Sequence, residues 1–330
     1  MSAMLVLARR DVEALLDVRE LIDALATAMA DLSAGRAVAP DRVAAPVAER
    51  GGLLAAMPGY VPSLGALTGK FVTLFPRNAD GPLPTHQALL GAFDPETGEP
   101  VALMDATAIT ELRTAAGSAL SVRLLARPDA RVLAIAGTGV QARAHARAVA
   151  LVRDIADVRI GGRSAEKAEA VARELREEGL PARAAGSIED AVRDADIVCA
   201  TTHALEPVIQ RAWLSPGVHV TSVGYNPEGR ELDAATVADA LVVLESRATA
   251  LAPAPAGAND ITRPIRHGVI GPEHVHAEIG ELVEGLRPGR TAAEQITLYK
   301  SVGVAVQDAA AAALVLARAR ETGAGARVEI

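Results

Sequence analysis

The sequence predicts an α/β fold in which a Rossmann-type, doubly wound dinucleotide-binding domain is joined to a second, α+β domain. Three observations lead to this prediction. A glycine-rich turn between a strand pattern and a helix pattern lies near the middle of the chain, strand and helix patterns alternate after it, and short β-rich runs precede it. With 330 residues, the chain is long enough for two domains.

The glycine-rich turn lies in residues 131–147, which read RVLAIAGTGVQARAHAR. The apolar run 132–136 predicts a strand buried on both faces of a parallel sheet. Gly137, Gly139 and Ala142 then follow with the spacing G-x-G-x-x-A. The first glycine permits a tight turn, the second leaves room for a pyrophosphate, and the alanine lets helix and strand pack closely. The helix N-terminus would face the phosphates, so the turn predicts dinucleotide binding.

The end of the next predicted strand, residues 158–160, indicates which dinucleotide is bound. An acidic residue about 20 residues beyond the glycines would hold the ribose 2′-hydroxyl of NAD. The chain instead has Gly161, Gly162, Arg163 and Ser164. Small residues would leave room for a 2′-phosphate, a guanidinium would bind it with two hydrogen bonds, and a hydroxyl would add another. NADP(H) is therefore preferred and NAD(H) remains possible; the alternative is that Arg163 is only a solvated loop residue.

Strand and helix patterns alternate after the turn, as a parallel, doubly wound sheet requires. Helices are expected at 165–178 and 187–195, and strands at 197–201, 218–223 and 241–244. The residues expected to contact the cofactor are Thr114, Gly137, Thr138, Gly139, Val140, Gln141, Gly162, Arg163, Ser164, Lys167, Thr201, Thr202, Val223 and Gly224.

The part of the chain before the turn predicts the α+β domain. Its first 35 residues have apolar positions at helical spacing and are expected to be mainly helical. Strands are expected at 70–75, 88–93 and 100–105, and the last two are separated by a turn sequence typical of a hairpin. A helix over 110–126 leads into the nucleotide-binding strand.

The C-terminal part of the chain determines the expected domain boundaries. Residues 250–266 are rich in proline, alanine and glycine and are expected to be irregular. A last long helix is expected over 297–320, and we expect it to pack back against the first domain. The first domain would then contain residues 1–125 and 300–330, and the dinucleotide-binding domain residues 126–299.

Composition excludes several classes of partner. The net charge of −8 and the lack of a basic run argue against nucleic acid. No segment is apolar for long enough to cross a bilayer, so no membrane association is expected. Residues 1–5 do not begin as a signal peptide does, and the sole cysteine, Cys199, lies in an apolar run as a small buried hydrophobe would. A cytoplasmic protein is expected.

The histidines of the second half are assigned structural roles. His267, His274 and His276 lie close together, but no cysteine or suitably spaced carboxylate accompanies them, so no metal site is expected. His145, on the helix after the glycine turn, is expected at the surface. The acidic residues at 174–178 are expected to form a solvated helix face.

Several short motifs, which follow one another from about residue 40 to residue 315, give the chain a family resemblance. With the glycine turn, they are Met57-Pro58-Gly59-Tyr60, Lys70, Leu83-Pro84-Thr85-His86-Gln87-Ala88, Leu103-Met104-Asp105-Ala106, Ile109-Thr110-Glu111-Leu112-Arg113-Thr114-Ala115-Ala116, Arg230-Glu231-Leu232-Asp233 and Lys300-Ser301-Val302-Gly303. Together they resemble the ornithine cyclodeaminase/mu-crystallin family. This resemblance is far more specific than the glycine turn alone.

The resemblance implies a homodimer whose subunits each have a nicotinamide dinucleotide domain and a domain that binds substrate and forms the dimer. The family acts on α-amino acids or their imines. Arg42, Lys70 and Arg113 match the positions that hold the substrate carboxylate. Arg113 lies on the helix joining the expected domains, where its guanidinium can grip a carboxylate in an interdomain cleft. A lysine at a strand end is otherwise usually a solvated charge.

Lys70 is also a candidate acid or base, because a lysine partly removed from water can exchange a proton with a substrate nitrogen. His86 is the second candidate; read alone, a single histidine after a proline would more often be structural. Which of the two handles the proton stays open at this point.

Departures from the cyclodeaminase pattern point to a different reaction. Cyclodeaminases need two carboxylates for a substrate with two amines, yet residues 53–56 contain no acid, and Asn226 occupies the place aligned with the second. An amide cannot act as a carboxylate base. The leading hypothesis is hydride transfer from NADPH to the C=N bond of an α-imino acid, either a cyclic ketimine or an imine of a 2-oxo acid, with Asn226 among the substrate-binding residues. The alternatives are an alanine dehydrogenase-type enzyme, an ornithine cyclodeaminase, or a non-catalytic ligand-binding protein.

Overall fold

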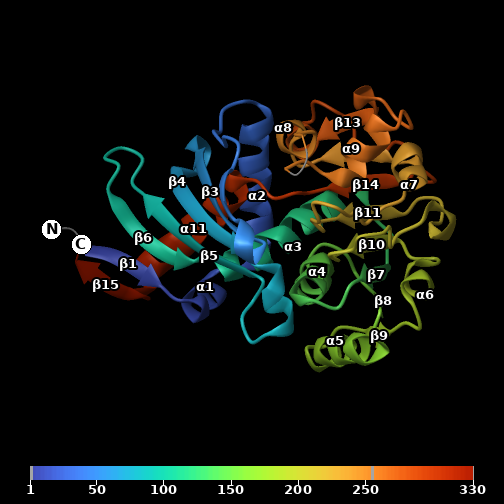
Figure 1. Cartoon of the computed structure of the whole chain (residues 1–330), viewed down its shortest axis with the longest axis horizontal. Coiled ribbons are helices and arrows are strands. Elements are labelled where there is room, and N and C mark those ends of the chain that lie inside the picture. The colour runs from blue at the N-terminus through green and yellow to red at the C-terminus, as the bar shows by residue number, and fades with distance from the viewer. Residues whose placement is uncertain (1–2, 254–255, 330) are drawn as a thin grey trace. The chain divides into compact units, whose positions relative to one another are not determined.

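The structure is a computed structural model that describes residues 3–253 and 256–329 (Figure 1). It divides into two compact units, which are treated separately. Unit 1 comprises the described residues of 1–113 and 304–330, and unit 2 comprises residues 114–303. The first division falls inside helix α3 (Ala106–Leu125), earlier than the expected boundary at residue 125. Within the described residues, no helix combines the length and apolar character needed to cross a bilayer.

Unit 1 is built on a seven-stranded sheet. Its order across the sheet is β15 (Ala326–Glu329), β1 (Ala3–Leu7), β6 (Pro100–Asp105), β5 (His86–Phe93), β4 (Ala66–Leu74), β3 (Gly52–Val61) and β2 (Val43–Val47). All neighbours are antiparallel except β1 and β6, which are parallel. The hairpin predicted from the turn sequence is confirmed as β5 and β6.

The first 35 residues are not wholly helical as expected, because β1 precedes the helices α1 (Arg9–Leu15) and α2 (Val18–Ser33). Five mostly apolar residues suffice for a strand when two neighbours supply its hydrogen bonds, here β6 and β15. Both neighbours are distant in sequence, so periodicity alone did not reveal them. The helical pattern itself is confirmed in α2, which is capped by the Asp17 carboxylate.

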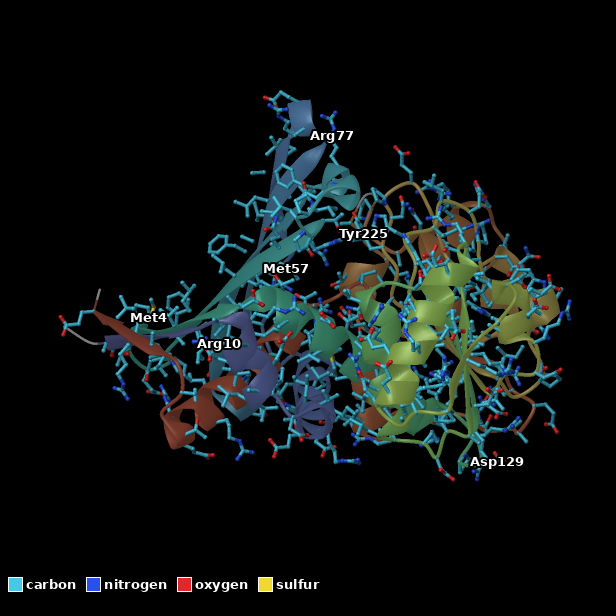
Figure 2. The ribbon with its side chains drawn as sticks, turned by 90° about the horizontal axis from the view of Figure 1, so that it is seen from below. Met4, Arg10, Met57, Arg77, Asp129 and Tyr225 are labelled. Atoms are coloured by element: carbon cyan, nitrogen blue, oxygen red, sulfur yellow. The ribbon has the colours of Figure 1, made fainter. Side chains whose placement is uncertain are left out.

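One face of this sheet is covered by α11 (Ala305–Thr322), which packs on β3 and β4 and on α2. In register across that face stand Met57, Lys70, Leu90 and Met104, and all four are buried. Because successive strand residues point to opposite faces, Lys70 is held among apolar side chains under a helix. Figure 2 shows Met57 within this sheet and Arg77, in the turn after β4, beyond its end.

The helix expected over residues 297–320 is wrong over its first eight residues. Residues Thr297–Lys300 form strand β14 of unit 2, and α11 begins only at Ala305. The run contains a β-branched and an aromatic residue and is buried between two other strands, which favours a strand over a helix. Gly303 separates the two elements with a positive φ of 79°.

Unit 2 contains an eight-stranded parallel sheet. Its order is β13 (Val275–Glu278), β12 (Leu241–Leu244), β14, β11 (His219–Ser222), β10 (Ile197–Ala200), β7 (Val132–Ala136), β8 (Asp157–Gly161) and β9 (Ala182–Ala184). The chain proceeds from β7 through β8 to β9 and then returns to the other side of β7 with β10 (Figure 1). The Rossmann-type, doubly wound architecture is therefore confirmed.

The helices of unit 2 connect these strands. They are α4 (Val140–Ala150), α5 (Ala165–Glu177), α6 (Ile188–Val192), α7 (Ala234–Asp239), α8 (Arg247–Ala250), α9 (Asn259–Arg266) and α10 (Ile279–Val283). Alternate residues of β7 enter two separate hydrophobic clusters, Leu133 with Ile135 and Ala134 with Ala136, so both faces of the sheet are covered. Cys199 is buried as expected. The segment 250–266 is more regular than its composition indicated, because α9 occupies its second half.

His145 is fully buried, so its expected surface position is wrong. Its Nδ1 lies 2.8 Å from the Gln141 carbonyl oxygen, and its Nε2 lies 2.9 Å from Ser118 Oγ, which is 2.9 Å from Thr221 Oγ1. A carbonyl only accepts, so Nδ1 donates, and Nε2 accepts from the serine. Burial lowers the pKa of His145 to about 4. The ring is therefore neutral and ties α4 to α3 and β11.

Unit 2 should lose stability as pH falls from 6.5 toward 4. In that window the unfolded chain binds a proton at His145 that the folded protein excludes, so His145 alone should lower the free energy of unfolding by about 2–3 kcal/mol between pH 6.5 and 4.5. Urea unfolding curves at the two pH values measure this. In His145→Gln that share of the pH dependence should disappear; an unchanged slope would contradict the assignment.

Candidate active site

The glycine-rich turn of unit 2 has the geometry that a dinucleotide needs. Gly137 has a φ of +131°, and a Cβ there would lie 2.5 Å from Thr201 Oγ1, so this position requires glycine. Gly139 is exposed as the N-cap of α4, and no atom lies within 4 Å of a Cβ built on it. Ala142 is fully buried. The space before the helix N-terminus therefore fits a pyrophosphate.

The other expected cofactor residues of unit 2 gather at the same edge of its sheet. Gly162 follows β8, residues 201–202 follow β10, and residues 223–224 follow β11. All these strands are parallel, so their carboxyl ends share one edge, and the order reverses there between β7 and β10. Figure 2 shows Tyr225, just after β11, and Asp129, just before β7, at opposite ends of unit 2.

Gly161, the last residue of β8, and Gly162, the next residue, do not leave room for a ligand in the way the sequence suggested. A Cβ on Gly161 would lie 2.8 Å from the Cα of Ile188, and one on Gly162 would lie 2.6 Å from Thr138 Cγ2. Both positions are small because other parts of unit 2 approach them closely. The argument for a 2′-phosphate therefore depends on the residues that follow.

Those residues stand at the start of α5. Arg163 is exposed in the loop before the helix, and Lys167 is exposed in its first turn. Ser164 is the N-cap, and its hydroxyl oxygen accepts a hydrogen bond of 3.2 Å from the Lys167 backbone N–H. Its own hydrogen remains available to donate. Two cations and a helix N-terminus thus meet at this loop, an arrangement that attracts phosphate.

Arg143 is a residue of this site that the sequence analysis missed. Its Nη1 donates to the carbonyl oxygens of Thr138 and Gly139, at 3.3 and 3.2 Å, and its Nε pairs with Glu174 at 2.5 Å. The arginine therefore holds the backbone of the glycine-rich turn through two of its carbonyl oxygens. Glu174 lies on the expected solvated acidic face of α5 with its side chain 41% exposed, and the hydrogen bond from the Arg143 guanidinium lowers its pKa.

Unit 1 brings two of the expected carboxylate-binding residues onto one buried acid. Lys70 lies in the middle of β4 and is 2% exposed, so it is not an edge charge. Its Nζ lies 2.6 Å from Asp308 Oδ2 and 3.5 Å from Thr110 Oγ1. The Arg113 guanidinium donates from Nε to Asp308 Oδ1 at 3.2 Å and from Nη1 to Gln307 Oε1 at 2.9 Å. Asp308 thus bridges the two cations.

The charges around Lys70 give it an unusual basicity. Burial lowers its pKa to about 8; the Asp308 carboxylate opposes this effect, while the positive charges of Arg113 and Arg42 add to it. Arg42, the third expected residue, is therefore close enough to act on Lys70. Lys70 and Arg113 share the single carboxylate of Asp308, so this group carries more positive than negative charge and suits an anionic ligand.

His86 lies apart from Lys70 along the sheet. It is exposed at the start of β5, where it pairs with Leu74, whereas Lys70 pairs with Leu90. Four residues along a strand correspond to about 13 Å. The His86 Nδ1 is 3.1 Å from Thr85 Oγ1. Of the two candidate acid–base residues, only Lys70 belongs to the buried cluster.

Asn226, in unit 2, has a structural use in the loop after β11. Its Nδ2 donates to the His203 carbonyl oxygen at 3.2 Å, and its Oδ1 accepts from the Glu228 N–H at 2.9 Å. The side chain is half-buried. These bonds shape the loop locally, as asparagine commonly does in turns.

Asp308 and Gln307 were not identified from the sequence, although a signal exists. Asp308 is the only charged residue in residues 305–317, which are otherwise alanine, valine, leucine and one glutamine. A lone acid on the buried face of an apolar helix needs a buried partner of opposite charge. In the described part of the chain no three His, Cys, Asp or Glu side chains are grouped to hold a metal ion.

The chain resembles known proteins over nearly its whole length. A sequence model of the ornithine cyclodeaminase/mu-crystallin family matches residues 2–323. The Delta(1)-pyrroline-2-carboxylate reductase of Bacillus cereus is 37% identical over 329 residues, which are 99% of this chain and 100% of that protein.

Two solved structures are similar over the whole chain. The Thermococcus litoralis Delta(1)-pyrroline-2-carboxylate reductase in complex with NADH and L-proline has a TM-score of 0.94 and 37% identity, over 98% of this chain and 100% of that one. An archaeal alanine dehydrogenase dimer with bound NAD has a TM-score of 0.92 and 32% identity, over 100% of both chains. The chain therefore belongs to the ornithine cyclodeaminase/mu-crystallin family.

Proposed function

We propose that this protein is an NAD(P)H-dependent reductase that converts the C=N bond of an α-imino acid, such as a cyclic ketimine carboxylate, into the C–N bond of an amino acid. The observation that carries the proposal is the buried cluster of Lys70, Arg113 and Asp308, which is built to hold a small carboxylate. The kinship with Delta(1)-pyrroline-2-carboxylate reductases over full length supports the same reaction.

The carboxylate of the substrate would bind to the three cations of unit 1. Arg113 uses Nε and Nη1 for Asp308 and Gln307, which holds its planar guanidinium in one orientation and leaves further N–H groups for a ligand. Arg42, whose positive charge acts on Lys70, would be the third cation near the substrate carboxylate. A substrate carboxylate would balance part of the excess positive charge, which a neutral ligand cannot do.

Lys70 would supply or retain the proton on the substrate nitrogen. A pKa of about 8 leaves the ammonium largely protonated at neutral pH but able to release its proton readily. An iminium carbon accepts hydride far more readily than a neutral imine carbon, so a nearby proton donor accelerates the reaction. His86, exposed along the strand, would serve this role less directly.

A nicotinamide dinucleotide would supply the hydride. The turn at 137–142 and the loops at 162–164, 201–202 and 223–224 would hold it, with Arg163 and Lys167 favouring a 2′-phosphate. The similar structures contain NADH and NAD, so the proposed NADPH preference rests on the loop that carries Arg163, Ser164 and Lys167. Arg113 and Thr114 are consecutive residues of α3, which joins an expected substrate residue to an expected cofactor residue within one helix.

The substrate side chain is expected to be apolar and compact. The neighbours of Lys70 on the covered face of the sheet are Met57 and Leu90, and residues 53–56 provide no acid for a second amine. A diamine such as ornithine would therefore place an ammonium without a partner among apolar groups, which is costly. Reductive formation of an amino acid from a 2-oxo acid and ammonia is the second candidate, because the alanine dehydrogenase is similar over its whole chain.

A homodimer is proposed from the uncovered face of the unit 1 sheet. Val43, Ala56, Phe71 and Leu89 stand in one row across four strands on the face opposite Lys70. Phe71 is 57% and Leu89 54% exposed. A continuous apolar row of this kind indicates a covered surface in the assembled protein, and a second copy would cover it. A dimer of the similar alanine dehydrogenase supports this choice.

The reaction should be detected as NAD(P)H oxidation with pyrroline-2-carboxylate or piperideine-2-carboxylate. The value of kcat/KM should fall as pH rises through about 8, because Lys70 then loses its proton.

Lys70→Met should lower kcat/KM at least about 100-fold. Lys70→Arg, which stays charged, should abolish the fall near pH 8 in whatever activity remains. Turnover of pyruvate with ammonia alone would favour the dehydrogenase; ammonia release from ornithine, with no imine reduction, would overturn the proposal.

Arg163→Asp should lower kcat/KM for NADPH by about 10- to 100-fold, because a charged hydrogen bond to phosphate contributes about 1.5–3 kcal/mol. The value for NADH should change by less than about threefold. Steady-state kinetics with both cofactors measure the ratio. Arg173→Asp, an exposed arginine on the same helix, is the matched control. An unchanged ratio in Arg163→Asp would mean that Arg163 does not contact the 2′-phosphate.

Phe71→Glu should convert the dimer into monomers, because each copy would bring a carboxylate into an apolar contact. Size-exclusion chromatography with light scattering gives the mass. Leu286→Glu, at a position 69% exposed in unit 2, should leave the dimer intact. A monomeric parent protein would contradict the homodimer, and a dimeric Phe71→Glu would show that another surface forms it.

A further inference from the structure

Two motifs that the proposed function does not use meet in the interior of unit 2. They are residues 230–233 and residues 300–303, which carried part of the family resemblance. Glu231, from the first, is 2% exposed, and Lys300, from the second, is fully buried. Asp260, at the start of α9, is 3% exposed and lies between them. Three buried charges in one place need a common explanation.

The Glu231 carboxylate binds both loops that follow β10 and β11. Its Oε1 accepts from the backbone N–H and the hydroxyl of Thr202, at 2.5 and 2.8 Å. Its Oε2 accepts from Ser222 Oγ and from the Gly224 N–H, both at 2.7 Å. A carboxylate has about four acceptor positions, so this one is fully used. Thr202 and Gly224 are both expected cofactor residues.

The Lys300 ammonium binds two of the same residues as Glu231, namely Ser222 and Gly224. It donates to Ser222 Oγ at 2.9 Å and to the Gly224 carbonyl oxygen at 2.8 Å, and it pairs with Asp260 Oδ2 at 3.0 Å. Its three N–H groups therefore all have acceptors. The Ser222 hydroxyl oxygen accepts a hydrogen bond from Lys300, and the hydroxyl donates its own hydrogen bond to Glu231, so the direction of each bond is fixed.

The start of α9 closes the network. Asp260 Oδ1 accepts from the backbone N–H groups of Glu231 and Leu232, at 2.7 and 2.9 Å. Asn259 Nδ2 donates to the carbonyl oxygens of residues 226, 227 and 229. Two adjacent side chains therefore fix the segment that carries Glu231. This anchor lies in the stretch that composition marked as irregular.

The two loops also approach each other very closely. A Cβ built on Gly224 would lie 2.2 Å from the Thr202 carbonyl oxygen and 2.4 Å from Glu231 Cδ. The loops can sit at this distance only because residue 224 has no side chain and because one carboxylate satisfies both. A loss of the carboxylate leaves two backbone N–H groups and two hydroxyls without their acceptor.

We propose that Glu231, with Lys300 and Asp260 as its charged supports, is a positioning residue that locks residues 201–202 and 223–224 into the form that binds the dinucleotide. The inference rests on the proposed cofactor site. Glu231 does not contact the reacting atoms; it acts through Thr202 and Gly224. Its carboxylate is required because an amide could accept on one side only and would present a donor to the other loop.

The test compares Glu231→Gln with Glu228→Gln, an exposed glutamate on the same loop. Isothermal titration calorimetry gives the Kd of NADH and NADPH, and hydrogen exchange of the free protein gives the protection of the Thr202 and Gly224 amides. Glu231→Gln should raise both Kd values at least tenfold and speed exchange at one or both amides, with a smaller change in the KM of the imino acid. Glu228→Gln should change neither.

A milder variant provides the test if Glu231→Gln does not fold. Ser222→Ala removes the hydroxyl that links Glu231 and Lys300 and should change Kd and exchange in the same direction, by less. Normal binding and normal amide protection in Glu231→Gln, or in Ser222→Ala where Glu231→Gln does not fold, would overturn the inference while leaving the proposed function intact. A parent protein that binds neither dinucleotide would instead overturn the proposed function, and the inference with it.

Discussion

The buried carboxylate of Asp308 is the constraint on which unit 1 depends. Lys70 and Arg113 are almost fully removed from water, and two cations at such positions repel each other and lose their hydration. One carboxylate that contacts both offsets these costs. One carboxylate does not neutralise the charge of two cations completely, which is why the cluster was proposed to bind an anion. Helix α11 therefore supplies the counterion as well as the cover of the sheet.

The same principle recurs in unit 2 with the signs reversed. There one ammonium, from Lys300, stands among the carboxylates of Glu231 and Asp260, and hydrogen bonds from two loops satisfy the remaining oxygens. Both units thus hold their expected ligand residues with buried ion pairs instead of exposed ones. Such pairs contribute less to net stability than to a unique arrangement of the groups they join, which is what a binding site requires.

Much of this could be predicted from local sequence. The glycine spacing, the alternation after it and the β5–β6 hairpin identified both architectures, because each signal lies within a few consecutive residues. The lysine and arginine of the carboxylate cluster followed from motif resemblance. Asp308 and Asp260 did not emerge as members of ion pairs, nor Glu231 as the acceptor for Thr202, because these partners are distant in sequence. The surface position predicted for His145 was wrong for the same reason. Its buried partners Ser118 and Thr221 are distant in sequence, and no periodicity reveals them.

Unit 1 is discontinuous: its first segment ends at Arg113, and its second begins only at residue 304. During translation, Arg113 therefore leaves the ribosome nearly two hundred residues before Asp308, and Lys70 more than two hundred residues before it, which at typical rates is about 10–50 seconds earlier. Until that helix arrives, the sheet has an uncovered face with an unpaired lysine. The nascent sheet is thus prevented from burying this face early, and unit 1 is completed only after the whole of unit 2 has been synthesised.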